Sequence, residues 1–168
     1  MLVARSRGIP IRAFSILQRN SNFPVVIVKQ ESPIKTVEDL DGKRVGFFYG
    51  HISTDVLRSF FKVAGINVEE VDVGFDYSPL LTNRVDAEWG FTVTAGIDLP
   101  ASGQPIRFIS PTSVGLQSHG YTLFAREDYL GEHRSVIERF TRATLKGLRD
   151  VVEDPKVGVT ALLARDPS

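Results

Sequence analysis

Residues 49–54 place several ligand-binding side chains next to one another. The run reads Tyr-Gly-His-Ile-Ser-Thr. It offers an aromatic ring at Tyr49, an imidazole at His51 and hydroxyl groups at Ser53 and Thr54, all of which can bind a small solute. Gly50 has no side chain and lets the backbone approach a ligand closely. The run lacks the spacing of a phosphate-binding P-loop, so it predicts reversible binding of a small molecule.

The elements around this run favour the same interpretation. Residues 44–48 are a short apolar run typical of a buried strand, and Ser53 or Thr54 is expected to cap an amphipathic helix that stops at Gly65. Open α/β sheets bind ligands where a strand's carboxyl end meets a helix's amino end, and that helix start offers free N–H groups. The alternative is an ordinary strand–helix connection in which the serine caps the helix and the histidine has no role.

Three other places carry candidate ligand-binding residues. Gln18 and Asn20 follow an expected strand and present paired amide donors and acceptors, although such residues also suit a solvated loop. Trp89 ends another expected strand and can stack on a planar ligand or fill the core. His119 and Tyr121 lie where a further strand begins, and the alternative for them is a strand with an inward tyrosine. We find no catalytic triad or carboxylate pair, so the chain is not expected to be an enzyme.

Composition excludes several functional classes. The 168 residues are 42% hydrophobic and 24% charged, with a net charge of zero, which argues against a nucleic-acid partner. The chain has no cysteine and only three widely separated histidines, so no disulfide, metal site or other cofactor is expected. The sequence contains no apolar run of membrane-spanning length and no segment with the pattern of a signal peptide.

The order of patterns predicts an α/β protein. Strand-like runs at residues 9–14, 24–29, 44–48, 68–73, 104–110 and 121–125 are separated by helical patterns, and a long helix is expected over 131–152. Alternating strands and helices favour mostly parallel sheets.

Three segments resemble type II periplasmic solute-binding proteins: DLDGKRVGFFYGHISTDVLRSFFKVAGINVEEVDV, LLTNRVDAEWGF and GYTLFARED. They are most similar to the branch that binds thiamine pyrimidine precursors, which is related to alkanesulfonate, taurine and nitrate binders. The resemblance implies two α/β lobes joined by a hinge, with the ligand between them. Residues 1–30 would be a partial first lobe, 31–117 a complete second lobe, and 118–168 the return to the first. The chain looks truncated at its N-terminus and also at its C-terminus.

The resemblance also implies a function. It predicts the solute-binding component of an ABC-type importer, which binds a small heteroaromatic solute outside the cytoplasm and docks on a membrane permease. An anion of the alkanesulfonate, taurine or nitrate type is the alternative ligand. A pyrimidine-synthase-like enzyme is disfavoured because its Cys-rich motif is absent, and a sensory ligand-binding module is a further alternative. A truncated first lobe would also favour pairing with a second copy of the chain.

Overall fold

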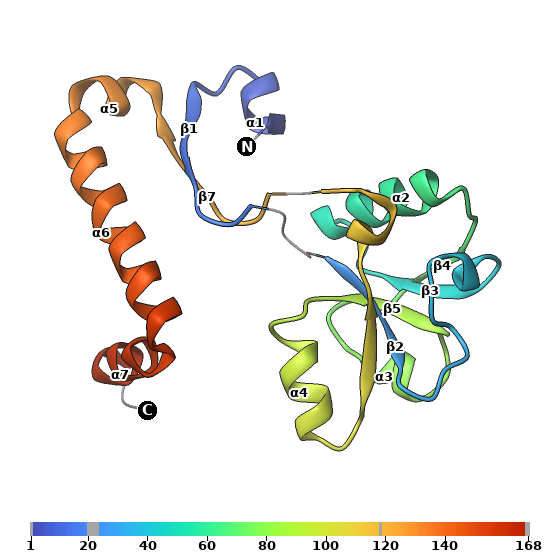
Figure 1. Ribbon diagram of the computed structural model, residues 1–168. Coiled ribbons are helices and arrows are strands. Elements are labelled where there is room, and N and C mark those ends of the chain that lie inside the picture. The colour runs from blue at the N-terminus through green and yellow to red at the C-terminus, as the bar shows by residue number, and fades with distance from the viewer. Residues whose placement is uncertain (1, 20–23, 118, 167–168) are drawn as a thin grey trace. The chain divides into compact units, whose positions relative to one another are not determined.

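The computed structural model describes residues 2–19, 24–117 and 119–166 (Figure 1). The chain divides into two compact units, Met1–Arg19 with Tyr121–Ser168 and Asn20–Gly120. The expected boundary near residue 30 assigned residues 24–29 to the first lobe. The structure instead places this segment, as strand β2 (Val25–Lys29), in the sheet of the second unit, because its backbone pairs there with β5 and β6.

The second unit is built on a five-stranded sheet with the strand order β4-β3-β5-β2-β6. In chain order its described elements are β2, η1 (Glu38–Leu40), β3 (Arg44–Phe47), α2 (Ile52–Ala64), β4 (Glu69–Asp72), α3 (Ser78–Leu81), β5 (Ala87–Gly90), α4 (Ala95–Ala101), β6 (Ile106–Ile109) and η2 (Pro111–Val114). Figure 1 shows α2 on one side of this sheet and α3 and α4 on the other. The sheet is therefore covered on both faces, as in α/β proteins generally.

Strand β2 shows how the sequence fills both faces. Its Val26 and Val28 belong to the core cluster that includes α2, whereas Val25 and Ile27 belong to the cluster that includes α3 and α4. All four residues are fully buried. Successive side chains of a strand point to opposite faces, so a strand buried on both faces must be continuously apolar.

The sheet is mixed, which corrects the expectation of mostly parallel sheets. Strand β3 pairs in parallel with β4 and β5, but β2 pairs antiparallel with both β5 and β6. Because β2 lies between two strands that run the other way, its reversed direction makes both of its pairings antiparallel. Residues 24–29 are apolar throughout, and such a run does not reveal a strand's direction.

The first unit has a smaller sheet and a helical end. Its described elements are α1 (Leu2–Ser6), β1 (Ile11–Ile16), β7 (Thr122–Arg126), α5 (Glu127–Glu132), α6 (Arg134–Glu153) and α7 (Pro155–Arg165). Strands β1 and β7 form an antiparallel ribbon, and Glu127 accepts charged hydrogen bonds from Arg5 and Arg12 beside it. The long helix expected over 131–152 is α6, separated from α5 at His133. No described helix has the length and apolar character needed to cross a lipid bilayer.

Candidate functional site

The loop between β3 and α2 is a tight turn. The His51 backbone N–H donates to the carbonyl of Phe48 at 3.2 Å, and Gly50 between them has a φ of +82°. This left-handed conformation is open to glycine at little cost and is strained for most other residues. In the structure Gly50 shapes this turn, whereas the sequence predicted that it lets the backbone approach a ligand.

His51, and neither hydroxyl residue, caps helix α2. Its Nδ1 accepts a hydrogen bond from the Ser53 backbone N–H at 3.3 Å and lies 2.8 Å from the Ser53 hydroxyl. The Thr54 hydroxyl donates to the Phe48 carbonyl at 2.6 Å. The expectation that Ser53 or Thr54 would be the cap is wrong, because the helix begins at Ile52 and both residues are buried in its first turn. Their hydroxyls hold the loop in place.

Five rings gather where this loop meets the ends of the neighbouring strands. We call them the aromatic cluster; its members are Phe48, His51, Phe75, Trp89 and Phe91. Trp89 is central, with ring centroids 5.0 Å from Phe75, 5.0 Å from Phe91, 5.5 Å from His51 and 5.7 Å from Phe48. Such separations are typical of favourable aromatic pairs. Strands β3, β4 and β5 end at this edge of the sheet, where open α/β sheets bind their ligands.

The cluster is buried at its base and open at its outer side. Trp89 and Phe91 are only 1% and 7% exposed, whereas Phe75 is 62% exposed. The Trp89 indole N–H donates to the Gly74 carbonyl at 3.0 Å, which fixes the ring in the base. Phe75 is a large apolar ring held at the surface against the other four members of the cluster. The Phe75 ring stands nearly perpendicular to the rings of Phe48 and Trp89, and an exposed aromatic ring is apolar surface on which a planar molecule can stack.

Phe48, Phe75 and Phe91 were not among the candidates that the sequence suggested. Phe75 follows β4, and β4 is the parallel neighbour of β3, so the two strands end at the same edge of the sheet. The sequence signal that could have identified Phe75 was therefore an aromatic residue two positions after the expected strand over 68–73. It was hidden because the sequence does not show which strands are neighbours.

The structure brings only some of the predicted residues together. His51 and Trp89 belong to the aromatic cluster, and Gly50, Ser53 and Thr54 shape the loop beside it. Tyr49 faces a different set of groups: its ring lies near Phe47, and the Arg58 guanidinium lies 5.7 Å from its centroid. Arg58 in turn forms a two-point ion pair with Glu70. Partial desolvation and the Glu70 carboxylate raise the pKa of Tyr49.

The remaining candidates lie elsewhere. Gln18 and Tyr121 belong to the first unit, where the backbone N–H groups of Leu17 and Gln18 donate to the Tyr121 carbonyl. Tyr121 is 71% exposed. His119 is an exposed residue near the end of the second unit. Asn20 lies outside the described residues.

A hollow elsewhere in the same unit is less suited to a ligand. It has a volume of about 320 Å³ and is lined by residues that include Lys29, Lys43, Asn83 and Asp86. Lys43 and Asp86 precede β3 and β5, so the hollow lies at the opposite edge of the sheet from the aromatic cluster. Three of its polar side chains already have partners within the chain: Lys29 donates to the Leu81 carbonyl and to Asn83, and Asp86 holds Arg44 in a 2.7 Å ion pair.

Metal chemistry has no visible basis in the described part of the chain. No three histidine or carboxylate side chains gather there in a way that could hold a metal ion. What the site offers is aromatic surface and a few hydrogen-bonding groups, which suit reversible binding.

Comparison with known proteins gives a consistent result. The chain is 28% identical to the formylaminopyrimidine-binding protein of Halalkalibacterium halodurans over 97% of its own length and 51% of that protein. It is 23% identical to the riboflavin-binding protein RibY of Chloroflexus aurantiacus, over 92% of this chain and 45% of that one. This chain thus spans about half the length of these relatives.

Structural comparison gives the fold. The periplasmic aliphatic sulphonate binding protein SsuA from Escherichia coli matches with a TM-score of 0.75 and 20% identity, over 96% of this chain and 56% of that chain. The fold is therefore the type II periplasmic-binding-protein fold expected from the sequence. Residues 1–157 match the family described as NMT1/THI5 like, and the chain belongs to that family.

Proposed function

We propose that this chain binds a small, flat heteroaromatic solute, without altering it, as part of the solute-binding component of an ABC-type importer. The observation that carries the proposal is the aromatic cluster at the carboxyl edge of the sheet, with Phe75 exposed on its outer side. The names of two relatives support it, since formylaminopyrimidine and riboflavin both contain planar heteroaromatic rings. The importer's membrane permease and a location outside the cytoplasm belong to the same proposal.

His51 supplies the polar part of this proposed site. Because its Nδ1 accepts from a backbone N–H, the neutral imidazole carries its proton on Nε2. A hydrogen-bond donor beside aromatic rings suits a ring nitrogen or carbonyl of a heteroaromatic ligand. We infer that stacking supplies much of the affinity and that the imidazole orients the ring.

The alternative ligand, an alkanesulfonate-type anion, receives less support from the geometry. The start of α2 would be its natural site, but His51 already accepts from the Ser53 N–H there. The likeness to sulphonate binders is one of fold, at 20% identity.

The chain's single tryptophan provides a direct test. Trp89 lies at the base of the cluster, so a ring that stacks on Phe75 should change its fluorescence. We expect saturable quenching when the chain is titrated with formylaminopyrimidine, and a rise in melting temperature from the same ligand. Riboflavin, an alkanesulfonate and nitrate complete the panel. A change in fluorescence or melting temperature with the anions alone would favour the alternative ligand. No change with any of the four compounds would contradict the proposal.

A further inference from the structure

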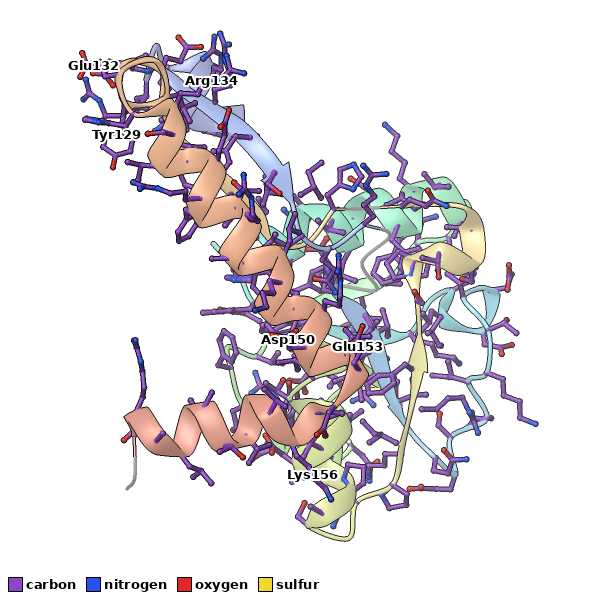
Figure 2. The ribbon with its side chains drawn as sticks, turned by 60° about the vertical axis from the view of Figure 1, so that its left-hand side comes forward. Tyr129, Glu132, Arg134, Asp150, Glu153 and Lys156 are labelled. Atoms are coloured by element: carbon purple, nitrogen blue, oxygen red, sulfur yellow. The ribbon has the colours of Figure 1, made fainter. Side chains whose placement is uncertain are left out.

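Glu88 of β5 is the ionisable side chain that the fold buries; no other ionisable side chain is buried among the described residues. Neither oxygen of its carboxyl group has a hydrogen-bond partner in that part of the chain. The charged residues labelled along α5–α7 in Figure 2 show the usual arrangement, since Glu132, Arg134, Glu153 and Lys156 are all exposed. An ionised carboxylate is unfavourable in dry surroundings without a partner, so the fold favours the protonated form of Glu88.

The Glu88 side chain lies against residues 73–77, the segment that joins β4 to α3. Glu88 and Val73 meet over Gly46, where an added Cβ would lie 2.8 Å from the Glu88 Cγ and 3.0 Å from the Val73 methyl groups. The Asp76 carboxylate of the same segment is close enough to repel a negative charge on Glu88. A charge that appears on Glu88 therefore acts on this segment.

The same segment carries the exposed ring of the aromatic cluster. Phe75 lies in its middle, and the carbonyl of Gly74 accepts the hydrogen bond from the Trp89 indole at 3.0 Å. Glu88 and Trp89 are successive residues of β5, so their side chains reach the segment from opposite faces of the sheet. The position of Phe75 thus depends on both of them.

The groups around Glu88 do not neutralise a charge on it. Besides Asp76, the ionisable residues on the surrounding elements that face its side of the sheet are Lys29 of β2, Arg44 of β3, Glu69 of β4, Tyr77 before α3, Asp86 of β5 and Asp98 of α4. Lys29 donates to the Leu81 carbonyl, and Arg44 is paired with Asp86. Burial raises the pKa of Glu88 to about 8, opposed by the nearby Leu80 backbone N–H and helped by Asp76.

We propose that Glu88 is a positioning residue that makes ligand binding depend on its proton: protonated, it keeps Phe75 in place, and ionised, it loosens residues 73–77. An ionised Glu88 needs contact with water, and residues 74–77, none of which is buried, are the part of its surroundings able to move. Affinity should therefore fall as pH rises through the pKa of Glu88. This inference rests on the proposed function and concerns its regulation.

The pH dependence of ligand affinity tests this role. If the protonated form alone binds, the Kd for formylaminopyrimidine should rise about tenfold from pH 7 to pH 9, because about one molecule in ten keeps the proton at pH 9. In Glu88→Gln, which cannot ionise, the Kd should stay level. Both chains contain His51, so any effect of its titration cancels in the ratio of their Kd values, which isothermal titration calorimetry measures.

A pair of surface variants tests the direction of the effect. Asp76→Asn removes a carboxylate that raises the pKa of Glu88, so the rise in Kd should begin at a lower pH. Asparagine keeps a side-chain oxygen that can accept from the Ser78 N–H and hydroxyl, as Asp76 does. Asp98→Asn is the control, because it removes a carboxylate that does not act on Glu88, and it should leave the pH profile unchanged.

A measurement without ligand follows the segment directly. Because the Trp89 indole donates to Gly74, its emission should move to longer wavelength between pH 7 and pH 9 in the wild type, while the far-ultraviolet circular dichroism stays that of the folded chain. In Glu88→Gln, the emission should not move. An unchanged emission in the wild type, or a loss of the folded spectrum in the same step, would overturn the proposal.

The two experiments also separate this inference from the proposed function. If formylaminopyrimidine binds at every pH with the same Kd, or if wild type and Glu88→Gln lose affinity equally, the role of Glu88 is refuted and the binding function stands. If the compound binds neither chain at any pH, the binding function fails, and the fluorescence of Trp89 still decides whether Glu88 controls the segment. If Glu88→Gln does not fold, the wild type and Asp76→Asn supply the same decision.

Discussion

Gly46 of β3 and Glu88 of β5 are partners across two parallel strands, and they approach so closely that neither tolerates much change in the other. A Cβ added to Gly46 would lie 2.8 Å from the Glu88 Cγ. Glu88 is fully buried, and neither of its carboxylate oxygens has a hydrogen-bond partner among the described residues. The core thus contains an unpaired acid that fits only because its neighbour has no side chain.

The first prediction concerns this contact. Gly46→Ala should lower the free energy of unfolding by about 1–3 kcal/mol, because the new methyl group meets Glu88 and Val73 in a packed interior. Denaturant unfolding followed by Trp89 fluorescence measures the change. The double variant with Glu88→Ala should recover part of the loss, since the two residues touch. Purely additive effects would show that the contact with Glu88 is not the cause.

The second prediction is a pH dependence of stability. Burial, helped by the nearby Asp76 carboxylate, raises the pKa of Glu88 from 4.5 to about 8. Between these values the folded chain keeps a proton that the unfolded chain has lost. The free energy of unfolding should therefore fall as pH rises from 4.5 to about 8, by about 1.4 kcal/mol per pH unit.

Glu88→Gln serves as the matched variant, because it keeps the shape of the side chain and removes the titration. Denaturant unfolding at several pH values between 5 and 8 should show the wild type losing stability relative to this variant as pH rises. A constant difference across this range would mean that Glu88 is charged in the folded state.

The third prediction concerns ligand binding. Phe75→Ala should raise the Kd for formylaminopyrimidine about tenfold, because stacking on an aromatic ring is worth about 1.4 kcal/mol. Tyr49→Ala is the control, since Tyr49 is 45% exposed but lies beside Arg58 and Phe47. Isothermal titration calorimetry measures the Kd of both variants. If Phe75→Ala and Tyr49→Ala weaken binding equally, the result would count against the aromatic cluster as the ligand-binding site.

The fourth prediction separates the two roles of His51. His51→Ala removes the N-cap of α2 and should cost about 1 kcal/mol of unfolding free energy. His51→Asn restores a good capping residue and should recover most of that stability, but it lacks the imidazole ring. Both variants should bind the ligand more weakly. If the asparagine variant binds like the wild type, the imidazole takes no part in recognition.

The sequence by itself determined the local elements of the site. The apolar run over 44–48 and the helical spacing that follows it specify β3 and α2, and Gly65 ends the helix with a φ of +72° as its type predicts. The family and the two-lobed fold could also be recognised from the order of these segments. The strand, the helix and its end each depend on residues that are close together in sequence.

Tertiary structure alone decided which groups share the site. Phe75 and Trp89 are fourteen positions apart in sequence and on different elements, yet their ring centroids are 5.0 Å apart because β4 and β5 both pair with β3. The reversed direction of β2 and the contact between Glu88 and Gly46 likewise result from pairing between strands that are distant in sequence. Periodicity specifies which residues are buried, whereas strand order and direction depend on pairing between distant segments, which no local pattern encodes.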